Sequence, residues 1–394
     1  KPGGILVTIF ADLHIHIGRA SSGAPVKITA SPKLTLEGIL WECLERKGIQ
    51  IAGIVDCASP PVLEDIRNLM AQGKLATLEG GGLTYCDQVT LFLGAEIELA
   101  GPNGGSAHYL AYTPSLEAME ELSCYLDKAI TNITLSSQRA ALDIRKVNDF
   151  VVRELDGIFM PAHAFTPFKS VYGNCVRRLT ELGVGFCALE LGLSADTDLA
   201  DRLLEVADLR FLSNSDAHSL PKIAREYNAL QLAKPDFVHF RAALWGDTAN
   251  RLVANYGLDP RLGKYHRTYC PQCELVVELE PPAGVCTHCK SEKVVVGVLD
   301  RITGIADEKE PVHPPHRPDY IHQVPLEFIP GVGHKTLEKL LQAFGTEMHI
   351  LHHTSVDELS QVVGTRLAAN IVAAREGRLG ISVGGGGHYG RIDR

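Results

Sequence analysis

Short apolar runs recur along the first 245 residues, and most of them end at a polar or charged residue. They are separated by amphipathic stretches such as Leu36–Lys47 and Val62–Gln72. This alternation is typical of buried parallel strands connected by helices. It predicts an α/β barrel, in which the C-terminal ends of the strands meet at one mouth. The runs are Ile5–Ala11, Ile51–Val55, Leu91–Ala95, Tyr109–Tyr112, Ile158–Ala162, Phe186–Leu189 and Arg210–Leu212.

Histidines and carboxylates dominate the ends of these runs, and a barrel would bring them together. The pairs His14/His16 and Asp216/His218 form His-x-His and Asp-x-His patterns, which are common in metal sites. Such a donor set suits two or three divalent ions of Zn, Mn, Mg or Fe. A lone histidine after a strand is more often only hydrogen-bonded, and Glu190 is equally well explained as a structural carboxylate. The order of the whole set therefore favours a metal centre, with candidate ligands His14, His16, Asp56, Glu96, His108, His163, Glu190, Asp216 and His218.

Four of these segments resemble motifs of the PHP (polymerase and histidinol phosphatase) superfamily: Ala11–His16, Gly94–Glu96, Pro161–His163 and Ser215–His218. The resemblance implies a distorted (β/α)7 barrel that holds two or three metal ions and hydrolyses phosphoesters. The segment Gly18-Arg19-Ala20 and residue Asp56 stand where the superfamily often has histidines, so two metals are as plausible as three. The ligands that the resemblance implies are His14, His16, Glu96, His108, His163, Asp216 and His218, and we expect His14, His16, Glu96, Asp216 and His218 to be catalytic.

The chemistry expected of such a centre is attack on phosphorus by a metal-bound hydroxide. Glu96 is expected to bridge the metals. Arg19 and Lys27, in the loop after the first strand, could contact a phosphate, although exposed basic side chains are usually only solvated.

A second metal site is predicted by four cysteines. Cys270 and Cys273 are separated by twelve residues from Cys286 and Cys289, and two Cys-x-x-Cys knuckles complete a tetrahedral structural zinc site. We expect this zinc to hold a small β-rich unit containing Leu275–Glu280 and Val294–Val298, with His288 outside the ligand set. The other six cysteines show no pairing pattern, which predicts a reducing, cytoplasmic compartment.

Residues 328–345 resemble a helix–hairpin–helix unit. Gly331 and Gly333 would expose backbone N–H groups at the start of a helix, where a DNA phosphate can bind, and Lys335 would add charge. A purely structural helical hairpin is the alternative. Residues 356–371 resemble a second, degenerate copy, in which Gly364-Thr365-Arg366 replaces the Gly-x-Gly turn.

The chain is therefore expected to contain five segments. These are a PHP-like barrel (1–245), a zinc domain with four cysteine ligands (246–306), a Pro- and His-rich linker (307–325), an all-α tandem helix–hairpin–helix domain (326–380) and a Gly-rich tail (381–394). This order resembles the endonuclease Q family of DNA repair nucleases. The resemblance implies nicking on the 5′ side of uracil, hypoxanthine, xanthine and abasic sites, leaving a 3′-hydroxyl and a 5′-phosphate.

A segment after His163 has the residue types that a flipped base requires, with aromatic faces for stacking and polar groups for hydrogen bonds. The alternative is a loop packed by its own aromatic side chains. The residues expected to form this base pocket are Phe165, Phe168, Ser170, Tyr172 and Asn174.

Two other functions remain open, a PHP phosphatase for small phosphate esters and a non-catalytic DNA-binding protein. The appended domains disfavour the phosphatase, and the intact metal motifs disfavour the non-catalytic protein. The expected partner is double-stranded DNA with a damaged base. A sliding clamp or another repair protein could also bind, although no docking motif is recognisable. No membrane association is expected, because no apolar run is long enough to span a bilayer and the N-terminus has no signal-peptide core.

The net charge of −9 argues at first against binding to nucleic acid. The first 245 residues carry −7 of it (22 basic against 29 acidic residues), and four of these carboxylates, Asp56, Glu96, Glu190 and Asp216, are candidate metal ligands. Divalent ions would offset much of that charge. We therefore expect weak, salt-sensitive binding to undamaged DNA.

Overall fold

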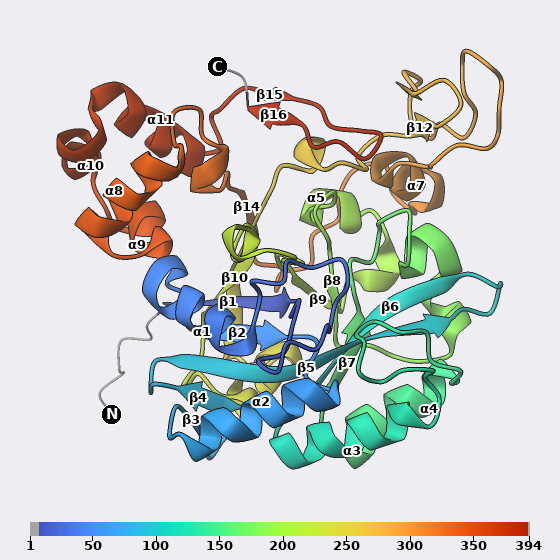
Figure 1. Ribbon diagram of the computed structural model, residues 1–394. Helices are drawn as coiled ribbons and strands as arrows, with labels where there is room; N and C mark the ends of the chain where they lie inside the picture. Colours follow the sequence, from blue (N-terminus) through green and yellow to red (C-terminus); the bar gives the residue numbers. More distant parts are fainter. Residues whose placement is uncertain (1–7, 393–394) are drawn as a thin grey trace.

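A mixed sheet of ten strands forms the centre of the computed structural model, which describes residues 8–392 (Figure 1). The strands follow the order β14-β11-β10-β1-β2-β5-β4-β3, and β6 joins β5 and β7. The first residues of the predicted run Ile5–Ala11 lie outside the described part of the chain. The strands of this sheet are β1 (Thr8–Ile15), β2 (Ile51–Ile54), β3 (Leu75–Thr77), β4 (Leu83–Tyr85), β5 (Val89–Ala100), β6 (Ser106–Thr113), β7 (Ile158–Pro161), β10 (Tyr227–Gln231), β11 (Arg251–Gly257) and β14 (Asp319–His322).

The α/β class is confirmed, whereas the distorted barrel is not confirmed and the strands expected to be parallel form a mixed sheet. β1 and β2 are parallel, as are β2 and β5, whereas β10 is antiparallel to β1, and β6 is antiparallel to both β5 and β7. β8 (Ala188–Glu190) and β9 (Arg210–Leu212) form a separate parallel pair. Between residues 8 and 392, the strand ladders do not close into a ring. The antiparallel pairing of β5 and β6 follows from their connection, because Gly101–Gly105 is too short for a parallel crossover.

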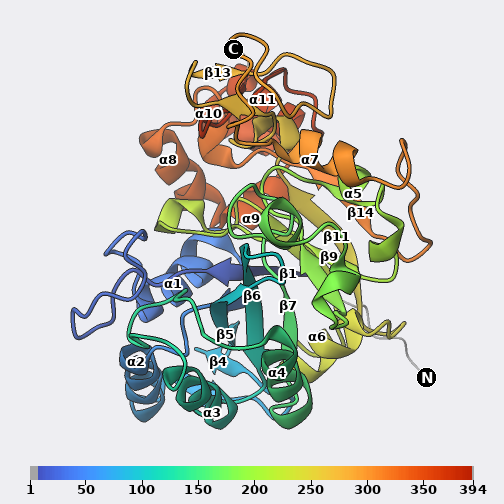
Figure 2. The same ribbon diagram turned by 90° about the vertical axis from the view of Figure 1, so that its right-hand side faces the viewer.

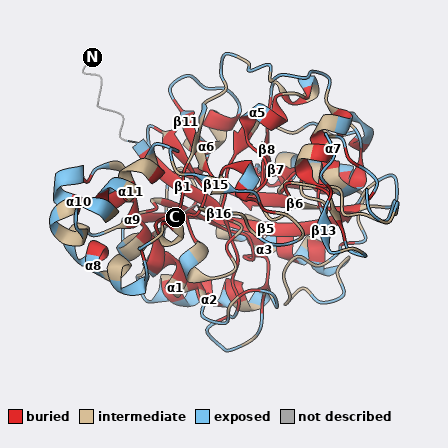
Figure 3. Ribbon diagram, turned by 90° about the horizontal axis from the view of Figure 1, so that it is seen from above, coloured by how far each residue is buried: buried red, intermediate tan, exposed pale blue. Residues whose placement is uncertain are grey.

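Helices cover the sheet on both sides. The side chains of β1 alternate from Ile9 to Leu13, because Ile9, Ala11 and Leu13 pack in a cluster with α6 (Phe237–Leu244), whereas Phe10 packs in the larger cluster. Ile15, which follows a register shift in the pairing with β2, also packs in the larger cluster. The larger cluster includes the buried faces of α1 (Leu36–Glu42), α2 (Pro60–Ala71), α3 (Leu116–Asp127) and α4 (Ile144–Asp149). In Figure 2, α2, α3 and α4 lie along the edge of the molecule opposite to α7 (Val298–Ile305) and α8 (His334–Phe344). A view from above shows the buried residues concentrated along the sheet (Figure 3).

The cysteine-containing unit is only partly β-structured. β12 (Tyr269–Cys270) and β13 (Leu275–Val276) form a short hairpin. The predicted strand Val294–Val298 is wrong, because only a single bridge links Val295 to Tyr269 and Val298 begins α7 (Val298–Ile305). The expected linker is also structured, since β14 pairs in parallel with β11 and extends the main sheet.

Four helices follow β14 and dock on the sheet domain: α8 (His334–Phe344), α9 (Glu347–His352), α10 (Val356–Val363) and α11 (Thr365–Arg375). The Nζ atom of Lys47 lies 2.9 Å from Oε1 of Glu347, and both side chains are buried. Arg46 pairs with Glu338 at 2.6 Å. These ion pairs connect the helices to the helical turn Cys43–Lys47 that continues α1. Across residues 8–392, no helix combines the length and the apolar character that a membrane crossing requires.

The tail folds back as a hairpin. β15 (Ile381–Ser382) pairs antiparallel with β16 (Arg391–Ile392), and residues 393–394 lie outside the described chain. Figure 1 shows the hairpin between α11 and β12, above the sheet domain.

Candidate metal centre

Glu96 lies at the centre of the histidine and carboxylate cluster predicted from the strand ends. Its Oε1 atom is 2.8 Å from Nδ1 of His108 and 3.3 Å from Nε2 of His163. The same oxygen is 3.6 Å from Nε2 of His14, and Oε2 is 3.6 Å from Nε2 of His16. One carboxylate thus faces four imidazoles, which is the arrangement expected of a ligand shared between metals.

The ligand atoms form three overlapping groups among the described residues. One is His14, His16 and Glu96, another is His16, Asp216 and His218, and the third is Glu96, His108 and His163. Glu96 and His16 each belong to two groups. The donors are imidazole nitrogens and carboxylate oxygens, which fit Zn²⁺, Mn²⁺ or Fe²⁺. The structure therefore brings together all seven ligands that the superfamily resemblance implied.

Asp56 and Glu190, which were predicted as metal ligands, lie behind the histidines instead of facing the centre of the cluster. Asp56 Oδ1 lies 3.0 Å from Nδ1 of His16, and Glu190 Oε2 lies 2.9 Å from Nδ1 of His14. Each carboxylate thus holds the nitrogen of the ring that does not face Glu96. A carboxylate on the second nitrogen of a ligating histidine fixes its orientation and raises its basicity. This geometry favours an orienting role for both residues.

The electrostatics of the cluster are those of a cation site. Burial acts to raise the pKa of Glu96, but the charges of His108 and Lys27 outweigh it and hold that pKa well below its ordinary value. Burial likewise acts to lower the pKa of His14, but Glu190, Asp216 and Glu96 raise it to about 10. Ionised carboxylates around histidines create a negative potential that a divalent ion can satisfy in place of protons.

Two of the ligands have a backbone conformation that is costly for a residue with a side chain. His163 has a φ of 30° and Asp216 a φ of 45°. Residues held in this region cost on the order of 1–3 kcal/mol and cluster at functional sites. Next to His163, Gly192 permits a close approach, since a Cβ there would lie 2.9 Å from the Cβ of His163.

A cavity of about 770 Å³ opens onto the metal centre. Lys27 lies inside it rather than at a rim, with Nζ 2.8 Å from Oε2 of Glu96. Arg19, the other basic residue expected to contact phosphate, is exposed on the surface. Further cationic and aromatic side chains on the wall are Phe168, Lys222, Arg225, Lys264, Tyr265 and Tyr389.

Of the five residues expected at a base pocket, the structure places only Phe168 on this wall. Phe165 and Tyr172 are buried and stack on each other with ring centroids 5.0 Å apart. The buried Ser170 hydroxyl donates to the carbonyl of Thr166, and Asn174 lines a separate surface hollow. The segment thus packs mainly on its own aromatic rings, which was the alternative considered for it.

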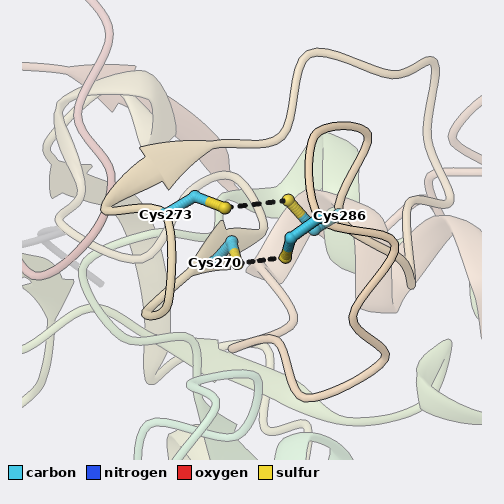
Figure 4. A group of neighbouring side chains, drawn as sticks. Cys270, Cys273 and Cys286 are labelled. Carbon is cyan, nitrogen blue, oxygen red and sulfur yellow. Dashed lines mark hydrogen bonds between the residues drawn. The ribbon is translucent and has the colours of Figure 1, made fainter.

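The four cysteines of the second site converge on one point (Figure 4). The Sγ atoms of Cys270 and Cys289 are 3.7 Å apart, and those of Cys273 and Cys286 are 3.9 Å apart. All four are free thiols at the spacing of a tetrahedral zinc site with four cysteine ligands, which leaves no open position for a substrate. His288 Nδ1 lies 3.5 Å from the sulfur of Cys273.

The predicted phosphate-binding turn lies on the surface of the helical domain. Gly331 has a φ of 97°, and Gly333 caps the N-terminus of α8. Gly331, Gly333 and Lys335 are exposed, and Lys335 lines a shallow hollow with Lys339 and Gly364. The start of α11 thus lies beside the start of α8.

Sequence reasoning missed Arg225, Lys264, Tyr265 and Tyr389, all of which line the cavity. Arg225 follows Asp216 by nine residues, and Tyr389 follows the glycines of the tail. For Tyr389, the preceding glycine run was a signal that the tail packs closely against another segment, because glycines allow close backbone approach as well as flexibility.

Similar proteins cover up to 98% of the chain. It is 46% identical over 392 residues to the uncharacterized Bacillus subtilis protein YqxK, which covers 98% of this chain and 99% of that protein. It is 36% identical over 256 residues to the uncharacterized Methanocaldococcus jannaschii protein MJ0043, which covers 58% of this chain and 31% of that protein. No family model matches the sequence.

Two solved structures share the fold, each with a TM-score of 0.83 and 29% identity over 98% of this chain. One is the lesion-specific endonuclease PfuEndoQ from Pyrococcus furiosus, of which 95% is covered. The other, of which 96% is covered, is endonuclease Q in complex with a 27-mer duplex that carries an abasic lesion at the active site.

Proposed function

Because the chain belongs to the endonuclease Q family of lesion-specific endonucleases, we propose that it nicks duplex DNA on the 5′ side of a damaged base or abasic site. The products are a 3′-hydroxyl and a 5′-phosphate. The observation that carries this proposal is the set of three overlapping ligand groups around Glu96, at the base of a cavity with cationic and aromatic walls.

The residues of the cluster divide into ligands and orienting groups. His14, His16, Glu96, His108, His163, Asp216 and His218 would hold two or three divalent ions. The chemistry that bound metals supply is activation of a water molecule and neutralisation of charge on the phosphoryl oxygens. Asp56 and Glu190 hold the imidazoles of His16 and His14 so that the Nε2 atoms face the centre. His14, His16 and Glu96 are buried, and their low-dielectric surroundings strengthen the interactions among them.

The cavity walls suit a flipped nucleotide and its phosphates. Phe168 is 52% exposed and contacts Tyr265 edge-to-face, with ring centroids 5.6 Å apart. An exposed aromatic face can stack a base taken out of the duplex. Lys264 places positive charge on the wall of the same cavity, where it can pair with phosphates, whereas Lys222 is paired with Glu327.

The helical domain binds the DNA backbone away from the lesion. The N–H groups at the start of α8, together with Lys335, would bind a backbone phosphate. Binding of this kind positions the duplex without reading its sequence. Specificity then rests on which nucleotides can leave the stack and enter the cavity. The proposed substrates are uracil, hypoxanthine, xanthine and abasic sites.

A substrate panel tests this function. End-labelled duplexes with a single uracil, hypoxanthine, xanthine or abasic site are incubated with Mg²⁺, Mn²⁺ or Zn²⁺, alongside undamaged duplex and a small phosphate ester. We expect cleavage of damaged duplexes only. Hydrolysis of the ester without any incision would instead support a phosphatase, and inactivity with tight DNA binding would support a non-catalytic protein.

A further inference from the structure

The glycine-rich tail is docked through its backbone on the segment that precedes the zinc unit. The N–H groups of Gly384, Gly387 and Gly390 donate to the carbonyls of Arg261, Lys264 and Leu262 at 2.7, 3.0 and 2.9 Å. A side chain would block this contact. A Cβ at Gly384 would lie 2.8 Å from the carbonyl oxygen of Gly263, and one at Gly390 would lie 2.4 Å from that of Ser382. The glycines therefore allow close packing here.

Docking of the tail brings Tyr389 into the wall of the active-site cavity. Its hydroxyl accepts a hydrogen bond from Nη1 of Arg225 at 2.9 Å. The guanidinium carbon of Arg225 lies 5.8 Å from the ring centroid of Tyr389, and so does the Nζ atom of Lys264. A residue close to the end of the chain thus reaches a cavity whose metal ligands begin at His14.

Arg225 connects Tyr389 to the segment that carries Asp216. Its Nε atom donates to the carbonyl of Ser215 at 2.8 Å, and Nη2 donates to the carbonyl of Asp216 at 3.3 Å. The side chain is buried, so these bonds and the one to Tyr389 replace contacts with water. The planar fork of arginine can hold all three acceptors at fixed angles, which a lysine cannot do.

The segment that Arg225 holds needs external support. Asp216 has a left-handed backbone, with a φ of 45°. Its Oδ1 atom lies 3.5 Å from Nε2 of His16 and 3.6 Å from Nε2 of His14. Bonds to the backbone carbonyls of Ser215 and Asp216 restrain the direction in which this carboxylate points.

We propose that Tyr389 is a positioning residue of the metal centre, acting through Arg225 on Asp216. The tail hairpin is then part of the active site, and the site is complete only when the C-terminal segment has folded onto Arg261–Lys264. This inference rests on the proposed nuclease function for its activity readout, but metal binding alone also tests it.

The test compares full-length Tyr389→Phe, which loses only the hydroxyl, with the matched control His388→Ala, an exposed neighbour on the same hairpin. Two quantities are measured: affinity for Mn²⁺ by calorimetric titration of metal-free protein, and kcat and KM for nicking of an abasic duplex. Loss of a partner behind a metal ligand typically costs at least about 10-fold. We expect Tyr389→Phe to weaken Mn²⁺ binding and to lower kcat by about that factor with little change in KM, and His388→Ala to match the parent.

A double variant separates positioning from a general loss of stability. Arg225→Lys should show a similar defect, and Tyr389→Phe combined with it should be no worse, because both act along one route. Additive losses, or Tyr389→Phe with parental Mn²⁺ affinity and kcat, would overturn the inference. If the parent nicks no DNA, the proposed function fails, and the Mn²⁺ titration still decides the role of Tyr389.

Discussion

Glu190 lies 2.9 Å from Nδ1 of His14, while Nε2 of the same ring faces Glu96 and Asp216. The carboxylate that ends β8 therefore fixes the ring orientation of a ligand that comes from β1. Oε1 of Glu190 also accepts the backbone N–H of His163 at 3.0 Å, and Asn214 donates to Oε2 at 2.9 Å. The buried side chain of Glu190 thus fixes the position of His163 relative to His14.

Glu190→Gln should weaken metal binding while the ligand set stays complete. An amide keeps the size of the carboxylate but gives the imidazole a weaker acceptor, so affinity for Mn²⁺ should fall on the order of 10–100-fold. Calorimetric titration of the metal-free protein measures this. The control is Glu120→Gln, whose carboxylate pairs with Arg67 at the surface. Equal affinities in the two variants would refute the orienting role.

Phe168→Ala should impair the use of damaged DNA. Stacking of a base on an aromatic side chain contributes about 1–3 kcal/mol, and we expect a loss in kcat/KM for a uracil-containing duplex within that range. Trp245→Ala is the matched control, because Trp245 is 53% exposed and is absent from the cavity wall. If both variants lose activity equally, Phe168 has no special role in stacking.

Cys273→Ser should release one zinc per chain and loosen the cavity wall. The four-cysteine unit follows Lys264 and Tyr265 directly, and its strand β12 begins at Tyr269. We therefore expect a lower melting temperature and a raised KM for DNA, with zinc content followed by elemental analysis. Cys124→Ser, which changes an exposed cysteine outside the cluster, should retain the parental zinc.

Glu226 should make the protein less stable as pH rises. Its side chain is buried, Oε1 accepts the N–H of Leu258 at 2.8 Å, and Oε2 has no hydrogen-bond partner within residues 8–392. Burial raises the pKa of Glu226 from 4.5 to about 8. Between these values the native state holds a proton that the unfolded state releases, so the free energy of unfolding falls as pH rises from about 4.5 to about 8.

Thermal melts at two pH values test whether the free energy of unfolding falls as pH rises. Glu226→Gln cannot ionise, so it should melt at a higher temperature than the parent at about pH 8.5 and lose that advantage at about pH 5. A stability difference that does not change with pH would contradict the assignment.

The clustering of the candidate metal ligands was predictable because its signal is local. His14 and His16 end one apolar run, and Asp216 and His218 follow another, so strand ends alone bring them together. Which carboxylates face the metal centre and which only orient a histidine was not predictable. Whether Asp56 faces the centre or the outer nitrogen of His16 depends on distances that no sequence pattern encodes.

The remaining differences between the predicted and the observed structure come from side-chain packing and long-range contacts. Phe165 and Tyr172 have the chemistry of a base pocket, but they stack on each other in the core. The antiparallel pairing of β5 and β6 was not readable, because the predicted runs Leu91–Ala95 and Tyr109–Tyr112 left a connection long enough for a parallel crossover, whereas the strands extend to Ala100 and from Ser106. The contact between Arg225 and Tyr389 spans 164 residues and has no local signature.

The position of the strand break on a duplex with one abasic site tests the central claim most directly. A sequencing gel of both labelled strands, with parent, Asp216→Ala and His16→Ala, locates every cut and identifies the new ends. We expect one nick on the 5′ side of the lesion, in the damaged strand only, with a 3′-hydroxyl and a 5′-phosphate, and loss of that nick in both variants. No break at the lesion with any divalent metal, or the same break in all three proteins, would contradict it.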